Sequence, residues 1–385
     1  MKENKIVKLS DVCDLIPGFA FKSSEFGEHK VKAVKIGDIQ PPYVNFESMT
    51  GVDISKYSVS RLAKYEIFKG DFVIAMTGAT IGKIGRYIAD TGAYINQRVL
   101  KFKPHDEVNS DFIYYIVSST SFQKYILNNV DSETAQPNIS AGSVGKYEFE
   151  LPSLEEQNRI ANILASIDNK IQLNRQINDN LVQQAEGILS NWLENYDLKQ
   201  YKLSDICYYV TEKIDTSKLG TENYISTENM NANKMGIQAS SGVPKGKATA
   251  YDYDDILVAN IRPYFKKIWK ASKKGGCSAD VLCIRALDST YSSILFWLLR
   301  QDSFFDYVMT GAKGSKMPRG DKSHIMNWSI ELPDIEYWSI VESSLRSIDE
   351  RMALHDQECI KLTQLRDTIL PKLISGELKI NDLDC

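Results

Sequence analysis

The most constraining feature of this chain is an internal repeat that spans almost its whole length. Three short stretches recur in the same order, two of them at an offset of 181 and one at an offset of 194. They are Leu151–Glu155 with Leu332–Glu336, Ser166–Asp168 with Ser347–Asp349, and, at the larger offset, Lys8–Cys13 with Lys202–Cys207. A repeat of this length predicts that both halves fold alike. Because the offset falls from 194 to 181 along the chain, the second copy is shorter than the first in its interior.

Weaker similarities connect the interiors of the two copies at intermediate offsets. Gly70–Ala75 resembles Asp254–Ala259 at offset 184, and Ser121–Tyr125 resembles Ser303–Tyr307 at offset 182. Since these similarities keep their order along the chain, we interpret the sequence as one duplicated fold. Its ends have changed little and its interiors have diverged.

Length and composition indicate folded globular domains. The 385 residues, of which 43% are hydrophobic, are enough for two domains with their own cores. No apolar run approaches the roughly 20 residues that a membrane span needs, and the start, Met1–Lys5, lacks the apolar stretch of a signal peptide. We therefore expect a cytoplasmic protein without membrane contact.

The cysteines and histidines do not form a metal-site or disulfide pattern. They are Cys13, Cys207, Cys277, Cys283, Cys359 and Cys385, with His29, His105, His324 and His355. There is no C-x-x-C pair and the histidines are scattered singly, so we expect no metal. Cys13 and Cys207 occupy equivalent repeat positions, where we expect each to be a small buried apolar residue.

The net charge of −4 is distributed unevenly between the segments. Residues 1–150 are neutral, 151–200 carry −3, 201–330 carry +5 and 331–385 carry −6. Within the second half, residues 261–330 contain 12 basic residues and five aspartates. Such an excess suits contact with phosphates, although charge alone fits a solvated surface equally well.

Two segments have the apolar periodicity of long amphipathic helices. From Ser153 onward, isoleucines and leucines recur at spacings near three, four and seven up to Trp192. Ser153 followed by Glu156 has the pattern of a capping box, which predicts a helix start near Leu154. The second helix runs toward Gly376, a suitable helix end, and Pro371 is expected to loosen its last turns.

We expect these two helices to pair as an antiparallel coiled coil, because neither apolar stripe is stable in water. The residues predicted to form the seam are Ile163, Ile167, Ile171, Leu181, Ile188, Leu345, Ile348, Met352, Leu362 and Ile369, within longer stripes that also include Ile340 and Leu365. Asn174 and Asn178, with their equivalents His355 and Cys359, place polar groups in or beside it, which would fix the register. The alternative is that each helix packs only on its own globular domain.

The segments inside the repeat are predicted to be mixed α/β (α+β). Buried strands are expected at Phe72–Met76 and Ile256–Ala259, and helices at Phe112–Val117 and Ser292–Leu299. The chain is therefore expected to have a pseudo-two-fold internal repeat with four parts. These are a globular domain at 1–151, a central helix at 152–197, a second globular domain at 198–332 and a C-terminal helix at 333–380.

Two motifs suggest chemistry that the rest of the sequence does not support. Gln40–Tyr43 resembles the Asn/Asp-Pro-Pro-Tyr tetrapeptide of amino-methyltransferases, but Gln replaces Asn or Asp and no convincing S-adenosylmethionine loop accompanies it. Gly78–Lys83 resembles a phosphate-binding loop, but it is one residue short and no Ser or Thr follows the lysine. With no credible nuclease cluster or activated nucleophile, we expect a non-catalytic chain.

Taken together, these landmarks resemble the specificity subunits of type I restriction-modification enzymes over essentially the whole chain. The most specific signature is Leu151–Gln157 followed by Ile160–Leu164. Further signs are Lys-Leu-Ser-Asp at 8 and 202, Pro17–Ser23, Thr77–Lys83, Gln136–Ser140 and Lys372–Leu378. The second half departs from the pattern, with Glu336–Trp338 in place of Glu155–Gln157 and Arg262–Tyr264 where the first half has its Gly-Ala-Thr turn.

The resemblance implies that each globular domain recognises one half of a split, asymmetric sequence in double-stranded DNA, and that the paired helices set the gap. It further implies that the helices bind two modification subunits, which carry S-adenosylmethionine, and that restriction subunits add ATP- and Mg-dependent cleavage. By this resemblance the chain itself holds no cofactor. Four residues inserted near Gln183 would lengthen the helix by roughly 6 Å, about two base-pair steps. We would expect such an insertion to widen the spacer between the two half-sites of the DNA target and to leave the half-sites unchanged.

Ten residues are the predicted DNA contacts, because they lie on polar, glycine-bearing or repeat-equivalent loops and have side chains suited to phosphates or base edges. They are Lys22, Lys83, Arg86, Gln97 and Arg98 in the first domain, and Arg262, Tyr264, Lys266, Lys316 and Arg319 in the second. A plain surface role is the alternative for each of them.

Three other functions remain open. The chain is compatible with the specificity subunit of a related restriction enzyme whose nuclease and methyltransferase share one polypeptide. It is also compatible with an adenine methyltransferase, which would bind S-adenosylmethionine on its own, and with a coiled-coil scaffold, which would not bind DNA.

Overall fold

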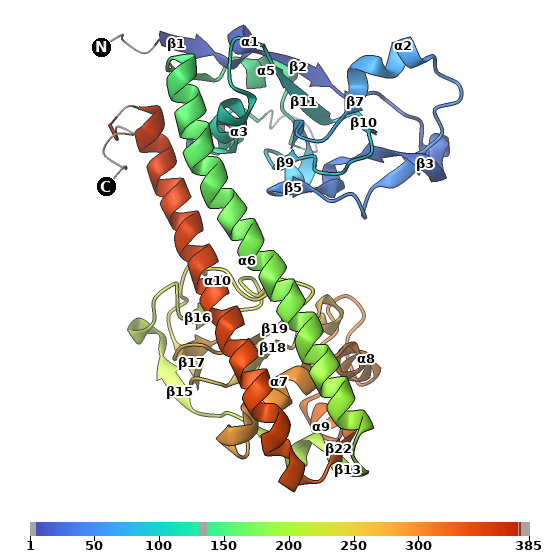
Figure 1. The fold of residues 1–385 in the computed structure, drawn as a ribbon, viewed down its shortest axis with the longest axis vertical. Coiled ribbons are helices and arrows are strands. Elements are labelled where there is room, and N and C mark those ends of the chain that lie inside the picture. Colours follow the sequence, from blue (N-terminus) through green and yellow to red (C-terminus); the bar gives the residue numbers. More distant parts are fainter. Residues whose placement is uncertain (1–4, 131–136, 376, 379–385) are drawn as a thin grey trace. The chain divides into compact units, whose positions relative to one another are not determined.

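The computed structural model describes residues 5–130, 137–375 and 377–378, drawn in Figure 1. Two compact units divide the chain, and each is described by itself. The first consists of residues 1–169 and 362–385, and the second of residues 170–361. Both long helices contribute to both units. The predicted four-part division of the chain is not tested by this arrangement and stays a prediction.

The first unit contains a six-stranded sheet, a four-stranded sheet and a strand pair. The sheet orders are β2-β11-β8-β9-β5-β4, β6-β3-β10-β7 and β1-β12. The strands are β1 (Lys5–Lys8), β2 (Cys13–Pro17), β3 (Phe26–Val34), β4 (Ile39–Gln40), β5 (Tyr43–Val44), β6 (Thr50–Val52), β7 (Glu66–Ile67), β8 (Phe72–Ala75), β9 (Ile84–Arg86), β10 (Ala93–Ile95), β11 (Val99–Pro104) and β12 (Glu148–Leu151). The helices that begin in this unit are α1 (Leu9–Val12), α2 (Val59–Leu62), α3 (Ser110–Ser118), α4 (Thr120–Asn128), α5 (Ala141–Gly145) and α6 (Leu154–Glu194).

The second unit contains two four-stranded sheets and a strand pair. The orders are β14-β21-β18-β19, β15-β17-β20-β16 and β13-β22. The strands are β13 (Leu198–Lys202), β14 (Cys207–Tyr209), β15 (Lys213–Asp215), β16 (Tyr224–Ile225), β17 (Lys247–Tyr251), β18 (Ile256–Ala259), β19 (Ile268–Lys270), β20 (Gly275–Cys277), β21 (Val281–Ala286) and β22 (Ser329–Pro333). The helices are α7 (Ser292–Leu299), α8 (Asp302–Thr310), α9 (Lys322–Met326) and α10 (Trp338–Ile374).

Strand register confirms the internal repeat. In the first unit Val7 pairs with Phe149, and in the second Tyr201 pairs with Ile330, at offsets of 194 and 181. In the central sheets Leu100 pairs with Ile74, and Leu282 with Val258, at offsets of 182 and 184. Ala33 of β3 pairs in parallel with Tyr94, and Tyr224 of β16 pairs in the same way with Gly276. Ala33 therefore corresponds to Tyr224, at an intermediate offset of 191. The shortening of the second copy is therefore spread over several places, and most of it lies between the β3 and β8 equivalents.

The expected strands and helices are confirmed with small changes of boundary. β8 and β18 are buried along their whole length, as the continuous apolar runs predicted. α3 is buried at six consecutive residues, Phe112–Val117, and α7 is buried throughout. These elements supply the cores, because the inward faces of the sheets and the apolar faces of α3 and α7 must pack together.

The two long helices run antiparallel, as predicted. Within the second unit, Cys359 Sγ donates to the carbonyl of Ile171, and Asn178 contacts Asp356 and the carbonyl of Met352. Within the first unit, Arg366 pairs with Asp168. Higher numbers on α6 thus meet lower numbers on α10.

The predicted seam residues are buried or half-buried, and they do two things at once. Ile167, Ile171, Leu181, Leu345, Ile348 and Ile369 are buried, while Ile163, Ile188, Met352 and Leu362 are half-buried. Leu181, Leu345 and Ile348 share one core cluster with Trp297 of α7. The helices therefore pack on each other and on the globular part of their unit, so that the two packing alternatives are both realised.

One detail of the helix prediction was wrong, one stays a prediction, and one falls outside the described residues. Ile340 and Leu365 belong to the predicted stripe but are 57% and 49% exposed. Pro371 lies inside α10, which continues to Ile374. Gly376, the expected helix end, lies outside the described residues.

Candidate nucleic-acid interface

In the first unit, backbone hydrogen bonds join three short segments into one surface. Gly78 N–H donates to the carbonyl of Pro137 at 3.0 Å, and Ile139 N–H donates to that of Met76 at 3.0 Å. Met76 N–H in turn donates to the carbonyl of Arg98 at 2.8 Å. We call residues 76–83, 96–98 and 137–139 the first interface. Gln136 of the Gln-Pro-Asn motif lies outside the described residues.

Four of the five predicted contacts of this unit lie on or beside the first interface. Lys83, Gln97 and Arg98 lie on it and are exposed. Gln97 N–H donates to the carbonyl of Phe19, which holds the segment that leads to exposed Lys22 next to it. Their role in DNA contact stays a prediction.

Arg86 is engaged within the fold, which speaks against the predicted phosphate contact. Its guanidinium pairs with Asp111 at 2.8 Å and lies 4.0 Å from the centre of the Tyr114 ring. The side chain is only 24% exposed. Arg86 thus links β9 to α3, and its loop-like sequence context concealed this structural role.

In the second unit, three segments form the corresponding surface. Arg262 N–H donates to the carbonyl of Pro318 at 2.7 Å, and Gly320 N–H donates to that of Asn260 at 3.2 Å. Lys234 N–H donates to the carbonyl of Lys266 at 2.8 Å, which adds a third segment. We call residues 230–238, 259–267 and 311–320 the second interface. It brings the predicted contacts Arg262, Tyr264, Lys266, Lys316 and Arg319 together.

The two interfaces have the same backbone plan. The bond from Arg262 to Pro318 corresponds to that from Gly78 to Pro137, at offsets of 184 and 181. Asn260 N–H donates to the carbonyl of Asp280 just as Met76 N–H donates to that of Arg98. The interfaces are therefore repeat equivalents even though their side chains differ.

Two glycines of the first interface are replaced by basic residues in the second. Gly78 and Gly82 have φ of +72° and +83°, and their equivalents Arg262 and Lys266 keep the left-handed conformation with φ of +50° at both positions. L-residues adopt this conformation at a cost of roughly 1–2 kcal/mol each. Strain of this kind tends to be retained at binding sites.

Aspartates hold most of the cations of the second interface in place. Lys234 and Lys266 both pair with Asp302, at 2.6 and 3.0 Å, and lower the pKa of its carboxyl. Arg319 pairs with Asp280 at 3.0 Å, and Lys313 pairs with Asp321 at 2.6 Å. Asp280 is the repeat equivalent of Arg98 in the first interface, so the two interfaces have side chains of opposite charge at this position.

Three residues of the second interface were missed by reasoning from the sequence. Lys234, Met235 and Phe265 lie on it, and Met235 and Phe265 are 65% and 38% exposed. Residues 230–238 correspond in the structure to the hairpin of β4 and β5, because Met230 pairs with Ile237 as Ile39 pairs with Val44. Their sequences do not resemble each other, so the repeat did not point to them. Phe265 was detectable as the neighbour of Tyr264 in a short loop.

A repeated aspartate attaches each globular part to the helices. Asp168 of α6 accepts a hydrogen bond from Tyr115 at 2.9 Å, and Asp349 of α10 accepts one from Trp297 Nε1 at 2.8 Å. Tyr115 and Trp297 are themselves repeat equivalents, at offset 182. The recurrence of Ser-Ile-Asp in the sequence thus has a structural cause.

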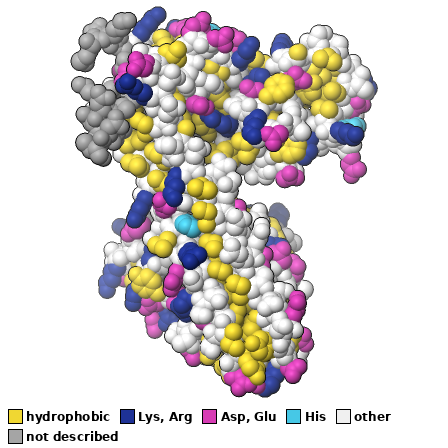
Figure 2. All heavy atoms as spheres, in the orientation of Figure 1, with side chains coloured by type: hydrophobic (Ala, Val, Ile, Leu, Met, Phe, Trp, Pro, Cys, Tyr) yellow, Lys and Arg dark blue, Asp and Glu magenta, His cyan; other side chains and the backbone are white. Residues whose placement is uncertain are grey.

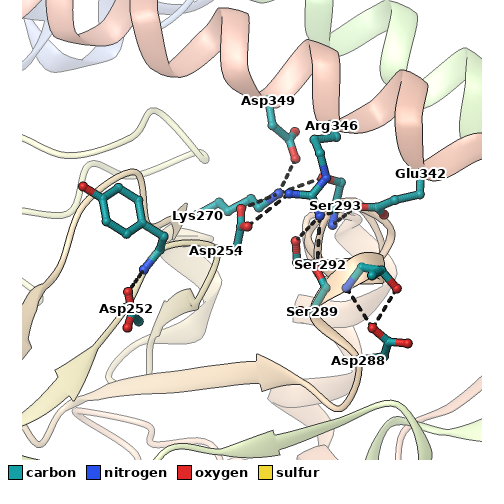
Figure 3. A network of polar contacts seen from close by, with 12 residues as sticks. Asp252, Asp254, Lys270, Asp288, Ser289, Ser292, Ser293, Glu342, Arg346 and Asp349 are labelled. Carbon is teal, nitrogen blue, oxygen red and sulfur yellow. Dashed lines mark hydrogen bonds and ion pairs between the residues drawn. The ribbon is translucent and has the colours of Figure 1, made fainter.

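Figure 3 shows the polar network around Asp349 in the second unit. Lys270 pairs with Asp349 at 2.8 Å, and their side chains are 9% and 8% exposed. Arg346 contacts Asp254 and Glu342, and Glu342 accepts the backbone N–H groups of Ser293 and Ile294 at the start of α7. α10 therefore holds both a strand end and a helix N-terminus of its globular part.

The replacement of the motif Glu155–Gln157 by Glu336–Trp338 in the second copy preserves one hydrogen bond. Gln157 Nε2 donates to the carbonyl of Pro152 at 2.9 Å, and Trp338 Nε1 donates to that of Pro333 at 2.9 Å. Donors and acceptors alike are repeat equivalents at offset 181. A different side chain thus performs the same attachment of the helix start.

Charge, metal-site geometry and hydropathy add three observations. Figure 2 shows basic and acidic side chains interspersed on the face of each unit that is in view. Within residues 5–130, 137–375 and 377–378, no group of three or more His, Cys, Asp or Glu side chains has the arrangement of a metal site. No helix in the same part of the chain is long and apolar enough to span a membrane.

Comparison with known proteins gives a consistent result. A family model described as the type I restriction modification DNA specificity domain matches residues 1–183. The MjaIX specificity subunit of a type I restriction enzyme from Methanocaldococcus jannaschii is 20% identical, over 94% of this chain and 97% of its own length. The MjaVIII specificity subunit from the same organism is 32% identical over 48% of this chain and 44% of its own length.

A solved structure shares the fold along the whole chain. The S subunit of a type I restriction-modification system from M. genitalium superposes with a TM-score of 0.57 and 17% sequence identity. The alignment covers 97% of this chain and 96% of that one.

Proposed function

We propose that this chain recognises a bipartite DNA target with one interface for each half. It belongs to the family of type I restriction-modification specificity subunits and recognises DNA sequence in that capacity. The observation that carries the proposal is the pair of equivalent interfaces. Their backbone plan is the same, while positions 78, 82, 98 and 138 differ in side chain from 262, 266, 280 and 319. Equivalent frames with different base-facing groups are suited to two unlike half-sites.

The helices would set the spacing between the half-sites and bind the partner subunits. α6 and α10 run antiparallel and have net charges of −3 and −1, and their attachments to the globular parts are repeated at Asp168 and Asp349. Repeated attachment sites on repeated helices favour binding of two copies of one partner. We propose that these partners are two modification subunits.

The chemistry would then lie outside this chain. In this proposal the modification subunits bind S-adenosylmethionine and methylate adenine, and restriction subunits supply ATP- and Mg-dependent translocation and cleavage. The chain itself would select the site without catalysis. This division also explains how a chain with a net charge of −4 takes part in DNA binding, since partner subunits contribute to the positive surface.

Methylome sequencing tests the proposal. A host that expresses the chain with its modification subunits should show adenine methylation at one split sequence. Gln97→Ala should alter specificity only in one half of that sequence, and Arg319→Ala only in the other. Loss of specificity in both halves from either variant would contradict a separate interface for each half.

The alternatives predict different outcomes. Saturable S-adenosylmethionine binding by the isolated chain would indicate a methyltransferase. A partner that contains both a nuclease and a methyltransferase motif would indicate the related enzyme in which the two are fused. An assembled complex that does not bind DNA would indicate a scaffold.

A further inference from the structure

The second interface exposes an unusual number of large apolar side chains. Met235, Tyr264, Phe265 and Met317 are 65%, 47%, 38% and 49% exposed, and each of its three segments contributes at least one of them. The rings of Tyr264 and Phe265 contact each other, with centroids 4.7 Å apart. Exposed apolar groups gathered in one place indicate a surface that a ligand covers.

The first interface has no equivalent of this aromatic pair. At offset 184, Tyr264 and Phe265 correspond to Thr80 and Ile81, and Ile81 is half-buried. On the described segments of the first interface no large apolar side chain is exposed: Lys83, Gln97, Arg98 and Asn138 are polar, and Ala79 and Pro137 are small or cyclic. The two interfaces therefore differ in chemical class: the second exposes large apolar side chains and the first does not.

A strained backbone holds the aromatic pair in place. Arg262 and Lys266, which flank the Pro263–Phe265 turn, are both left-handed, and so are Asn233 and Lys234 on the adjoining segment. Asn233 N–H donates to the carbonyl of Phe265 at 2.8 Å. Such conformations persist only where the surrounding structure enforces them, and they cluster at ligand-binding sites.

The charge around the apolar groups favours a polyanion. The three segments contain seven Lys and Arg residues and no Asp or Glu. Asp280, Asp302 and Asp321 on neighbouring segments pair with four of the seven, which leaves an excess of cations. An apolar cluster within a basic rim fits the edge of a DNA groove better than the apolar surface of a protein.

We propose that the second interface recognises thymine by apolar contact of Tyr264 and Phe265 with 5-methyl groups, with Met235 and Met317 beside them, whereas the first interface recognises its half-site by polar contacts. The 5-methyl group of thymine is the one apolar group that base edges present in the major groove. The inference rests on the proposed function and specifies how one of its two half-sites is recognised.

The test uses the chain assembled with its modification subunits and a duplex that carries the target found by methylome sequencing. The thymines of one half-site at a time are replaced by deoxyuridine, which removes only the methyl groups, and binding is measured by fluorescence anisotropy. In one half-site the replacement should weaken binding about fourfold per contacted methyl, which corresponds to the ~0.8 kcal/mol of a buried methylene-sized group. In the other half-site binding should not change.

A double variant then links the effect to the proposed residues. In Tyr264→Ala/Phe265→Ala the complex should bind more weakly, and deoxyuridine should cause no further loss. Tyr253→Ala is the matched control, because Tyr253 is 59% exposed but lies outside the second interface. With this variant the deoxyuridine effect should remain as in the unsubstituted chain.

The outcomes separate this inference from the proposed function. If the complex does not prefer the target duplex over a shuffled one, the proposed function itself is wrong. If it prefers the target but neither half-site responds to deoxyuridine, or the response persists in the double variant, DNA recognition stands and the thymine contact is wrong. The deoxyuridine measurement on the unsubstituted chain does not depend on whether the variant folds.

Discussion

At the scale of single residues, the left-handed positions of the second interface are expected to lower the stability of the protein and to strengthen DNA binding. Arg262 occupies a conformation in which its equivalent, Gly78, is unstrained. Its Nε is also buried without a hydrogen-bond partner. A residue that lowers the stability of the free protein is expected to be retained because it contributes to DNA binding.

We therefore expect Arg262→Gly to stabilise the second unit while it weakens DNA binding. Removal of the left-handed side chain should contribute about 1 kcal/mol, which for a domain of this size corresponds to roughly 2–4 °C in Tm. The reverse change, Gly78→Arg, is the matched control and should lower the Tm of the first unit. Calorimetric unfolding and anisotropy titrations measure both effects, and a lower Tm for Arg262→Gly would contradict the argument from strain.

The buried pair Lys270–Asp349 leads to a second residue-scale expectation. Asp349→Asn removes the charge of a side chain that is 8% exposed, and it leaves the buried ammonium of Lys270 with Asp254 at 3.2 Å. Breaking a buried pair in this way typically costs about 3–5 kcal/mol. Asp168→Asn removes the equivalent carboxylate, which is 25% exposed and pairs with Arg366, and should cost less. Denaturant unfolding of both variants would test this order, and equal losses would show that burial of the pair is unimportant.

At the scale of elements, the centre of the helix pair is polar. Asn174 is fully buried; its Nδ2 donates to Glu358 at 2.7 Å, while its Oδ1 has no partner. Asn178 Nδ2 contacts Asp356 and the carbonyl of Met352, and Asn178 Oδ1 lies 2.8 Å from His355 Nδ1. Two asparagines one turn apart are thus satisfied to different degrees.

This difference predicts opposite effects for the same substitution. Asn174→Leu removes an unsatisfied buried oxygen and should stabilise the helix pair by about 1 kcal/mol or more. Asn178→Leu removes three polar contacts and should destabilise it by a similar amount. Thermal unfolding followed by circular dichroism would compare the two variants, and destabilisation by both would mean that Asn174 contributes more than its contacts indicate.

Elements that repeat were predictable from the sequence, and contacts that do not repeat were not. Repeat order and apolar runs together located β8 and β18, and apolar runs located α3 and α7. The contacts of Arg86 with Asp111 and Tyr114 were not predictable, because both partners come from a helix that the sequence does not place beside it. The segment at 230–238 was missed because its links to Phe265 and Lys266, which are backbone hydrogen bonds and a shared ion pair with Asp302, leave no pattern in the sequence.

At the scale of the whole molecule, the structure shows that Gln183 is an unsuitable place to lengthen the helices. Gln183 lies between Leu181 and Ala185, and both belong to the core of the second unit. Four extra residues there would rotate this packing face and disrupt the unit. The boundary between the units, at Asn169–Lys170 on α6 and Lys361–Leu362 on α10, is the place where added turns leave both cores intact.

We expect a matched insertion of seven residues after Asn169 and after Lys361 to widen the spacer of the DNA target without changing its half-sites. Seven residues preserve the apolar stripe and add about 10 Å of helix, which corresponds to roughly three base-pair steps of 3.4 Å. An insertion in α6 alone is the control, since it breaks the pairing of the stripes and should abolish methylation. Methylome sequencing would identify the new target, and an unchanged spacer in the matched variant would show that the helices do not set the distance between the half-sites.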